Sequence, residues 1–492
     1  MPKIEDARCL TFDVAADFTL PSFESLFPTG FRVEESPRSW ECAYVDTIDM
    51  DLHAQHVALC RCVGSNEDAW RLTTGQDEAS LHITLPVGDG TEPPPAAQAL
   101  VSGVSLARPL VPAAVVRHRR SLHHVVGGDD ELVLEVGDDN VRATRAGRPC
   151  ETAEWRQITL RAGPEHVGLL SGAVAHLESL GANRVQESSE LARSLGLATR
   201  RKVRRPTGPE VITAYVGQQT RALFAGDVAL RHGLNPVHET RVAIRRLRST
   251  LRVFAPYVDA TEASRLDTEL AWYAGLLGTV RDGEVQRARL SDAVDRLPPE
   301  LVMGPVSSYI NQHLASEQQA NRERLLIAMD AERYRALLTT LAGWTTTQPI
   351  VRTIDDDEPP ALDRQVRKAS RQASRRLADA LDVRDRDDAL HRARKATKRA
   401  RYAAELVTPL GLARTTAMVK HFTAIQKALG DYQDSVVAAQ LLRSLGAAAG
   451  TTPGHNGFTY GLLYAQEVQA GEHARTRAAW LLEHTPGQLA DD

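Results

Sequence analysis

The chain has 492 residues, of which 42% are hydrophobic and 25% are charged, and its formal net charge is −4. This length predicts roughly two to four domains, and this composition excludes an intrinsically disordered chain. No apolar run reaches the length that a bilayer requires, so a membrane protein is excluded, and the net charge argues against a protein that coats nucleic acid over its whole surface.

The first ten residues lack a basic segment that leads into an apolar one, so no secretory signal is expected and a cytoplasmic location is predicted. The five cysteines are odd in number, lie in the first third of the chain and lack CxxC spacing, which predicts reduced thiols. Cys60 and Cys62 would point the same way on a strand, but buried structural cysteines are the favoured interpretation and no metal is assigned to them.

Residues 1–199 are predicted to form an α+β domain in which strands dominate. A helix is expected at Pro164–Leu180, and a basic, proline-bounded stretch at residues 200–208 predicts a linker. Apolar residues alternate or run together between turn residues, as strands require, at residues 69–73, 80–85 and 131–136.

Nearly every segment after residue 208 has the period of an amphipathic helix. A polar, proline-containing connection at residues 345–360 divides this region into halves of residues 209–343 and 362–484. The predicted helices are Ala214–Arg231, Val237–Phe254, Thr261–Asp295, Pro305–Met329, Glu332–Gly343, Leu362–Leu381, Ala389–Val407, Thr415–Leu445 and Tyr460–Leu482.

The two halves repeat each other. Residues 237–248 match residues 390–401 at the histidine and at every later cation of the first copy. The following helices match as well, because Leu277–Asp282 aligns with Leu429–Asp434. A duplicated helical hairpin predicts an all-α domain of two pseudo-symmetric bundles, with Asp282 and Asp434 orienting basic side chains.

The repeat carries two basic stripes, because residues three and four apart share one face of a helix. Each stripe borders apolar positions, where unpaired cations would lose solvation unless an anion met them, and carboxylates at i+4 are mostly missing. A solvated helix face is the alternative interpretation. The stripes consist of His238, Arg241, Arg245, Arg248 and Arg252 in the first half, and His391, Arg394, Lys398 and Arg401 in the second.

A ligand for such stripes should be long and densely charged, because the cations continue for several turns of about 5.4 Å each. Inorganic polyphosphate has this shape, and guanidinium groups can bind its oxygens bidentately. Nucleic acid is the less favoured partner, because base stacking requires exposed aromatic residues among the cations and only Tyr402 is well placed.

The motif of a histidine at the start of a helix, followed by basic residues at i+3, i+7 and i+10, resembles that of the CHAD family, the conserved histidine α-helical domain. The resemblance covers residues 209–484. It implies a basic central groove, polyphosphate binding through both stripes and association with polyphosphate granules. It also implies weaker phosphate contacts from Arg371, Arg375, Lys420 and Lys427.

Residues 1–199 resemble the CYTH, or triphosphate tunnel, family in the segments Tyr44–Leu52, Ala58–Cys62, Trp70–Thr73 and Ser188–Ala192. That family forms an antiparallel β-barrel tunnel in which basic residues bind a triphosphate and carboxylates hold a divalent metal. The resemblance therefore implies such a tunnel here.

The family's Glu-x-Glu-x-Lys motif is missing, because Ala7, Cys9 and Thr11 stand in its place. Glu190 stands where the resemblance implies a lysine, while the acids Glu135, Asp138 and Asp139 survive. We therefore predict an inactive domain with no catalytic residue, metal or cofactor. The alternative is a triphosphatase or polyphosphatase that uses Mg²⁺ or Mn²⁺ in this domain.

Overall fold

The structure is a computed structural model that divides into two compact units, Met1–Lys202 and Val203–Asp492, with the division inside the stretch predicted as a linker. The structure describes residues 8–485 except 22–30, 65–67, 76–79, 89, 128–130, 148–150, 186–189, 197–205, 347–358, 384–386, 413 and 452–455.

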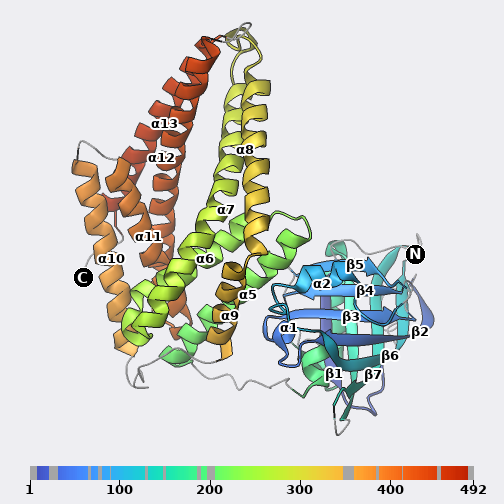
Figure 1. Ribbon diagram of the computed structural model, residues 1–492. Coiled ribbons are helices and arrows are strands. Elements are labelled where there is room, and N and C mark those ends of the chain that lie inside the picture. Colours follow the sequence, from blue (N-terminus) through green and yellow to red (C-terminus); the bar gives the residue numbers. More distant parts are fainter. Residues whose placement is uncertain are drawn as a thin grey trace. The chain divides into compact units, whose positions relative to one another are not determined.

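The first unit is built on a nine-stranded antiparallel sheet with the strand order β5-β4-β3-β2-β6-β7-β8-β1-β9, which is strongly curved (Figure 1). This confirms the predicted antiparallel sheet. Among the described residues no pairing joins β5 to β9, so strand pairing does not close the sheet into a ring. The strands are β1 Arg8–Val14, β2 Arg32–Asp46, β3 Val57–Val63, β4 Ala69–Thr74, β5 Leu81–Pro86, β6 Val111–Val126, β7 Leu132–Arg145, β8 Thr152–Ala162 and β9 Asn183–Val185.

Each face of this sheet buries a separate apolar cluster, because successive side chains of a strand point to opposite faces. Helix α3, Val167–Ser179, packs Leu170 and Leu177 against β1, β7 and β8, and it lies within the predicted helix. Helix α4, Glu190–Ser194, places Leu191 against a cluster from β2, β3, β6 and β7. The short helices α1, Asp51–Ala54, and α2, Pro95–Val101, were not predicted.

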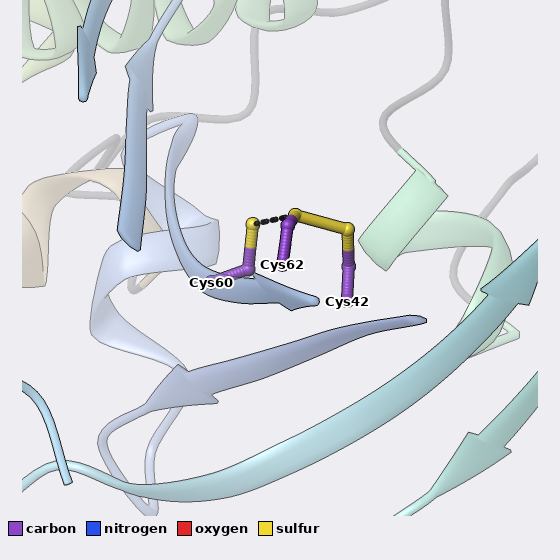
Figure 2. Close-up of side chains that lie close together, drawn as sticks. All are labelled: Cys42, Cys60 and Cys62. Carbon is purple, nitrogen blue, oxygen red and sulfur yellow. Dashed lines mark hydrogen bonds between the residues drawn. A yellow bond between two sulfur atoms is a disulfide. The ribbon is translucent and has the colours of Figure 1, made fainter. Parts of the chain in front are cut away.

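The cysteines of the first unit differ in part from the prediction. Cys42 on β2 and Cys62 on β3 are directly opposite each other, and a disulfide joins them (Figure 2). The expectation of reduced thiols is therefore wrong for this pair, since strand pairing brings together two cysteines that are 20 residues apart. The prediction that Cys60 and Cys62 are buried is confirmed.

The described part of the second unit contains nine α-helices, each matching one predicted helix. The largest boundary difference is at the first helix, which begins at Gly208 because Thr207 and Glu210 form a capping box. The helices are α5 Gly208–Arg231, α6 Val237–Val253, α7 Ala260–Asp295, α8 Val306–Met329, α9 Glu332–Thr346, α10 Pro359–Asp382, α11 Asp387–Val407, α12 Thr415–Ala449 and α13 Phe458–Glu483.

Two long helix pairs, α7 with α8 and α12 with α13, form two arms of the second unit (Figure 1). The ends of the arms share an apolar cluster that includes Leu290, Ile310, Leu442 and Leu463. The two basic helices α6 and α11 are in contact. The repeated basic segments therefore lie against each other, and this contact brings the two predicted stripes together.

Candidate anion-binding site

Helices α6 and α11 line a cavity of about 370 Å³ that contains cations from both repeats. Ala274 of α7 completes the lining. The predicted site residues that line this cavity are Arg241, Arg245, Arg248, Arg252, His391, Arg394 and Lys398. Two further cations in the lining, Lys395 and Arg399, stand beside the predicted stripe of α11 and were not predicted as site residues.

Lys398 is at the centre of the charge in this cavity. Burial, together with the positive charges of Arg394, Arg245 and Arg241, lowers its pKa to about 6, while the carboxylate of Asp434 has the opposite effect. A lysine in such surroundings is held largely neutral at pH 7. The position therefore favours any ligand that brings negative charge.

Two guanidinium groups beside Lys398 are also incompletely compensated. In the described part of the structure, the buried Nε atoms of Arg245 and Arg394 have no hydrogen-bond partner. Burial, opposed by the charge of Asp434, lowers the pKa of Arg394. Buried donors without acceptors cost free energy, so an anion with several oxygens would satisfy groups that the protein itself does not.

The outer cations of the α6 stripe have acidic partners on α7. Arg241 Nη1 lies 2.9 Å from Asp282 Oδ1, which confirms the predicted role of Asp282. Arg248 and Arg252 share Asp267 at 2.8 Å and 2.7 Å. These carboxylates come from the neighbouring helix and not from i+4 of the same helix, so the spacing within α6 could not reveal them. The uncompensated charge is consequently concentrated around Lys398.

A glycine in each repeat lies against the first arginine of the stripe. A Cβ atom at Gly278 would lie 3.5 Å from Arg241 Nη2, and one at Gly430 would lie 3.7 Å from Arg394 Nη2. Both glycines are inside long helices, where glycine costs about 1 kcal/mol relative to alanine. Their equivalent positions show that the repeat in the sequence corresponds to an equivalent arrangement of arginine and helix in space.

The two motif histidines differ in position. His391 lines the cavity and its Nδ1 atom lies 3.2 Å from Gln433 Oε1, whereas His238 does not line it. Burial and neighbouring cations lower the pKa of both rings, so both are predominantly neutral at pH 7. We predicted that His391 opens its helix, but α11 begins earlier, at Asp387.

A second cavity of about 480 Å³ shares Arg252 and Arg399 with the first and extends to α10. Its other cations, Lys368 and Arg376, were missed because the sequence indicated the neighbouring face of α10. That helix buries Val366, Ala373 and Leu377, and this packing determines which face borders the cavity.

Six predicted residues line neither cavity. On α10 and α12, four of them are exposed, and Arg401 of α11 pairs with Glu405 at 2.8 Å. The six residues are His238, Arg371, Arg375, Arg401, Lys420 and Lys427.

The acids that survive in the first unit are engaged by basic side chains. Asp139 receives two hydrogen bonds of 2.6 Å from Arg120, and Asp138 receives bonds of 2.9 Å and 2.7 Å from Arg156. Glu135 lies 3.4 Å from His124. Ala7 is outside the described residues.

Glu190, which stands where the family resemblance suggests a lysine, accepts a hydrogen bond of 3.2 Å from Tyr44 Oη. It also lies 3.4 Å from His118 Nε2.

The family model of the CHAD domain matches residues 214–443. Two proteins of Mycobacterium tuberculosis, "Uncharacterized protein MT2285" of strain CDC 1551 / Oshkosh and "Uncharacterized protein Rv2226" of strain ATCC 25618 / H37Rv, are each 30% identical over 489 residues. Each match covers 94% of this chain and 93% of the relative. This chain belongs to their family and contains a CHAD domain.

The solved structure of PptA from Streptomyces chartreusis is also similar, with 20% identity and a TM-score of 0.49, and the match covers 56% of this chain and 100% of that chain. The resemblance of the first unit to the CYTH family stays a prediction. In the part of the chain that the structure describes, no helix is both long enough and apolar enough to span a bilayer.

Proposed function

We propose that this protein binds inorganic polyphosphate in the cavity between α6 and α11 of its CHAD domain. One observation supports this proposal above the others: Arg245, Arg394 and Lys398 converge from both repeats without enough negative charge to balance them. A polyanion would supply that charge and satisfy the buried guanidinium nitrogens.

The shape of the basic surface favours a chain of phosphates over a single small anion. The two cavities share Arg252 and Arg399, so cations continue from α6 and α11 to Lys368 and Arg376. Each phosphate unit of the chain can engage a different cation in turn. Binding should therefore weaken steeply as salt concentration rises, because counterions are released from the polyanion.

The same surface is poorly suited to nucleic acid. Neither cavity has a Phe, Tyr or Trp among its described lining residues. Tyr402 is only 2% exposed, and the guanidinium groups of Arg246 and Arg401 lie 5.6 Å and 5.4 Å from the centre of its ring. It cannot stack on a base without a rearrangement of the core, so phosphate contacts alone would have to hold a nucleic acid.

The test compares two variants of the full chain, in each of which four basic residues are replaced with glutamate. The cavity variant carries Arg241→Glu, Arg245→Glu, Arg394→Glu and Lys398→Glu. The control variant carries Arg371→Glu, Arg375→Glu, Lys420→Glu and Lys427→Glu, all at exposed positions outside the cavities.

Polyphosphate affinity is measured over a range of salt concentrations, and the fold of each variant is checked by circular dichroism. We expect the cavity variant to lose at least about 100-fold in affinity, because the cations that contact the anion become repulsive, and the control to lose far less. Equal losses would show that overall charge and not the cavity determines binding. Unchanged binding by a folded cavity variant would refute the proposal.

Two further measurements on the same preparation separate this proposal from its alternatives. In the first, RNA is added as a competitor of polyphosphate at matched phosphate concentration. A clear preference for RNA would identify nucleic acid, and not polyphosphate, as the ligand. Incubation with tripolyphosphate and Mg²⁺ or Mn²⁺ tests the first unit for hydrolysis. Metal-dependent phosphate release there would overturn the predicted inactivity without changing the expected result for the cavity variant.

A further inference from the structure

Three cysteine sulfur atoms converge inside the first unit, and none of these cysteines takes part in the proposed anion site. Figure 2 shows the bond between Cys42 and Cys62, with Cys60 beside them. The Sγ atoms of Cys60 and Cys62 are 3.6 Å apart, and all three Sγ atoms lie within 4.8 Å of one another. The residues are 4%, 7% and 1% exposed for Cys42, Cys60 and Cys62.

Strand pairing explains this convergence. Cys42 of β2 is the direct partner of Cys62 on β3, and Tyr44 is the partner of Cys60. Residues two apart on a strand point to the same face, so Cys60 and Cys62 both face the core cluster that Leu191 of α4 covers. A disulfide needs only two of these sulfur atoms, and the thiol of Cys60 lies beside the pair in the same buried cluster.

The spacing of the three sulfur atoms suits a metal ion. Zn²⁺ binds thiolates at about 2.3 Å in a tetrahedral arrangement, which sets neighbouring sulfur atoms roughly 3.8 Å apart. The separation of Cys60 and Cys62 is already close to this value. Reduction removes the bond between Cys42 and Cys62 and allows these two sulfur atoms to move apart by ordinary van der Waals repulsion. The three thiols would then form one face of a tetrahedron.

We propose that Cys42, Cys60 and Cys62 form a thiolate site for Zn²⁺ in the reduced protein and that the disulfide is the oxidised, metal-free form of this site. Three thiolates with Zn²⁺ carry one net negative charge, whereas Cu⁺ would leave two, which costs more in an apolar core. A solvent molecule completes the fourth position.

The two forms interconvert by thiol–disulfide exchange followed by metal binding. A dithiol reductant transfers two electrons and two protons to the Cys42–Cys62 disulfide, which yields two thiols and the disulfide of the reductant. Zn²⁺ then displaces one proton from each of the three thiols as it binds. Oxidation reverses both steps and releases the ion. The sequence indicated no such site because Cys42 becomes a neighbour of the other two cysteines only through the sheet.

The experiment uses the full chain, reduced with a dithiol, stripped of metal by a chelator and then freed of both reagents under anaerobic conditions. Zn²⁺ alone is titrated in competition with a chromophoric chelator, and elemental analysis gives the stoichiometry. We expect one tightly bound Zn²⁺ per reduced chain and none in the oxidised chain. Co²⁺ in place of Zn²⁺ should give a sulfur-to-metal charge-transfer band in the near ultraviolet.

The variant Cys60→Ala removes the third ligand while leaving the disulfide pair intact, and it should lower the affinity for Zn²⁺ by at least about 100-fold. Its oxidation to the Cys42–Cys62 disulfide shows that the sheet is folded. The matched control is Cys9→Ser, at an exposed cysteine of the same unit outside the three-sulfur group, and it should bind Zn²⁺ as the wild type does. The proposal is overturned if the reduced wild type binds no Zn²⁺, or if Cys60→Ala binds it equally well.

Discussion

Replacing Lys398 with arginine tests whether a bound polyanion causes the amine of Lys398, at the centre of the cavity, to become protonated. In the free protein, a pKa of about 6 for Lys398 leaves about 3% of the lysine protonated at pH 7.5. A bound polyanion favours the charged form and raises the pKa of Lys398 towards the ordinary lysine value of 10.5. Binding at pH 7.5 should therefore take up nearly one proton per site.

The sign of the pH dependence follows from this shift. Because only the complex holds the proton above pH 6, polyphosphate affinity should fall by up to about tenfold for each pH unit above 6, until the pKa of the complex is reached. In the ligand-free protein, the unfolded chain binds the proton between pH 6 and 10.5 and the folded protein does not. The free energy of unfolding should therefore rise with pH over this window.

The measurement is titration calorimetry above pH 7 in buffers of different ionisation enthalpy, which gives the number of protons taken up. In Lys398→Arg the side chain is always charged, so the uptake should disappear. The groups that face Lys398 are Arg241 and Arg245 of α6, Arg394 of α11 and Asp434 of α12, with His391 in the same cavity. A His391→Gln control separates the contribution of the imidazole. Equal proton uptake by the wild type and Lys398→Arg would refute the reasoning.

Two predictions concern the packing that holds the CHAD domain together. Gly226→Ala would place a Cβ atom 2.2 Å from the buried Thr240 Oγ1, so it should lower the free energy of unfolding by about 1–3 kcal/mol in denaturant titrations. Adding Thr240→Ala should recover part of this loss, and no recovery would contradict the steric explanation. Arg289→Met leaves the carboxylate of Glu467, which Arg289 contacts at 2.6 Å and whose side chain is 8% exposed, without its cation. We expect a loss of about 3–5 kcal/mol. Arg289→Met with Glu467→Met should be more stable than the single variant, and the opposite order would show that the pair is not the cause.

The helices of the second unit were predictable because their signals are local. Apolar residues three and four apart determine which face of α6 is buried, and Ile244, Leu247 and Leu251 are buried as that period requires. The duplicated motif predicted that two equivalent basic helices exist. The start of α5 was placed too late because Thr207 and Glu210 cap the helix upstream of its apolar pattern.

What the sequence determined by itself is therefore the helices of the second unit, the predominance of strands in the first unit and the two basic stripes, since each depends on residues close together along the chain. Only the tertiary structure decided which cations remain uncompensated, because Asp267 and Asp282 reach the α6 stripe from α7. It also decided which face of α10 meets the cavity and that Cys42 joins Cys60 and Cys62. These outcomes depend on contacts between distant segments, and such contacts follow from packing and not from spacing along the chain.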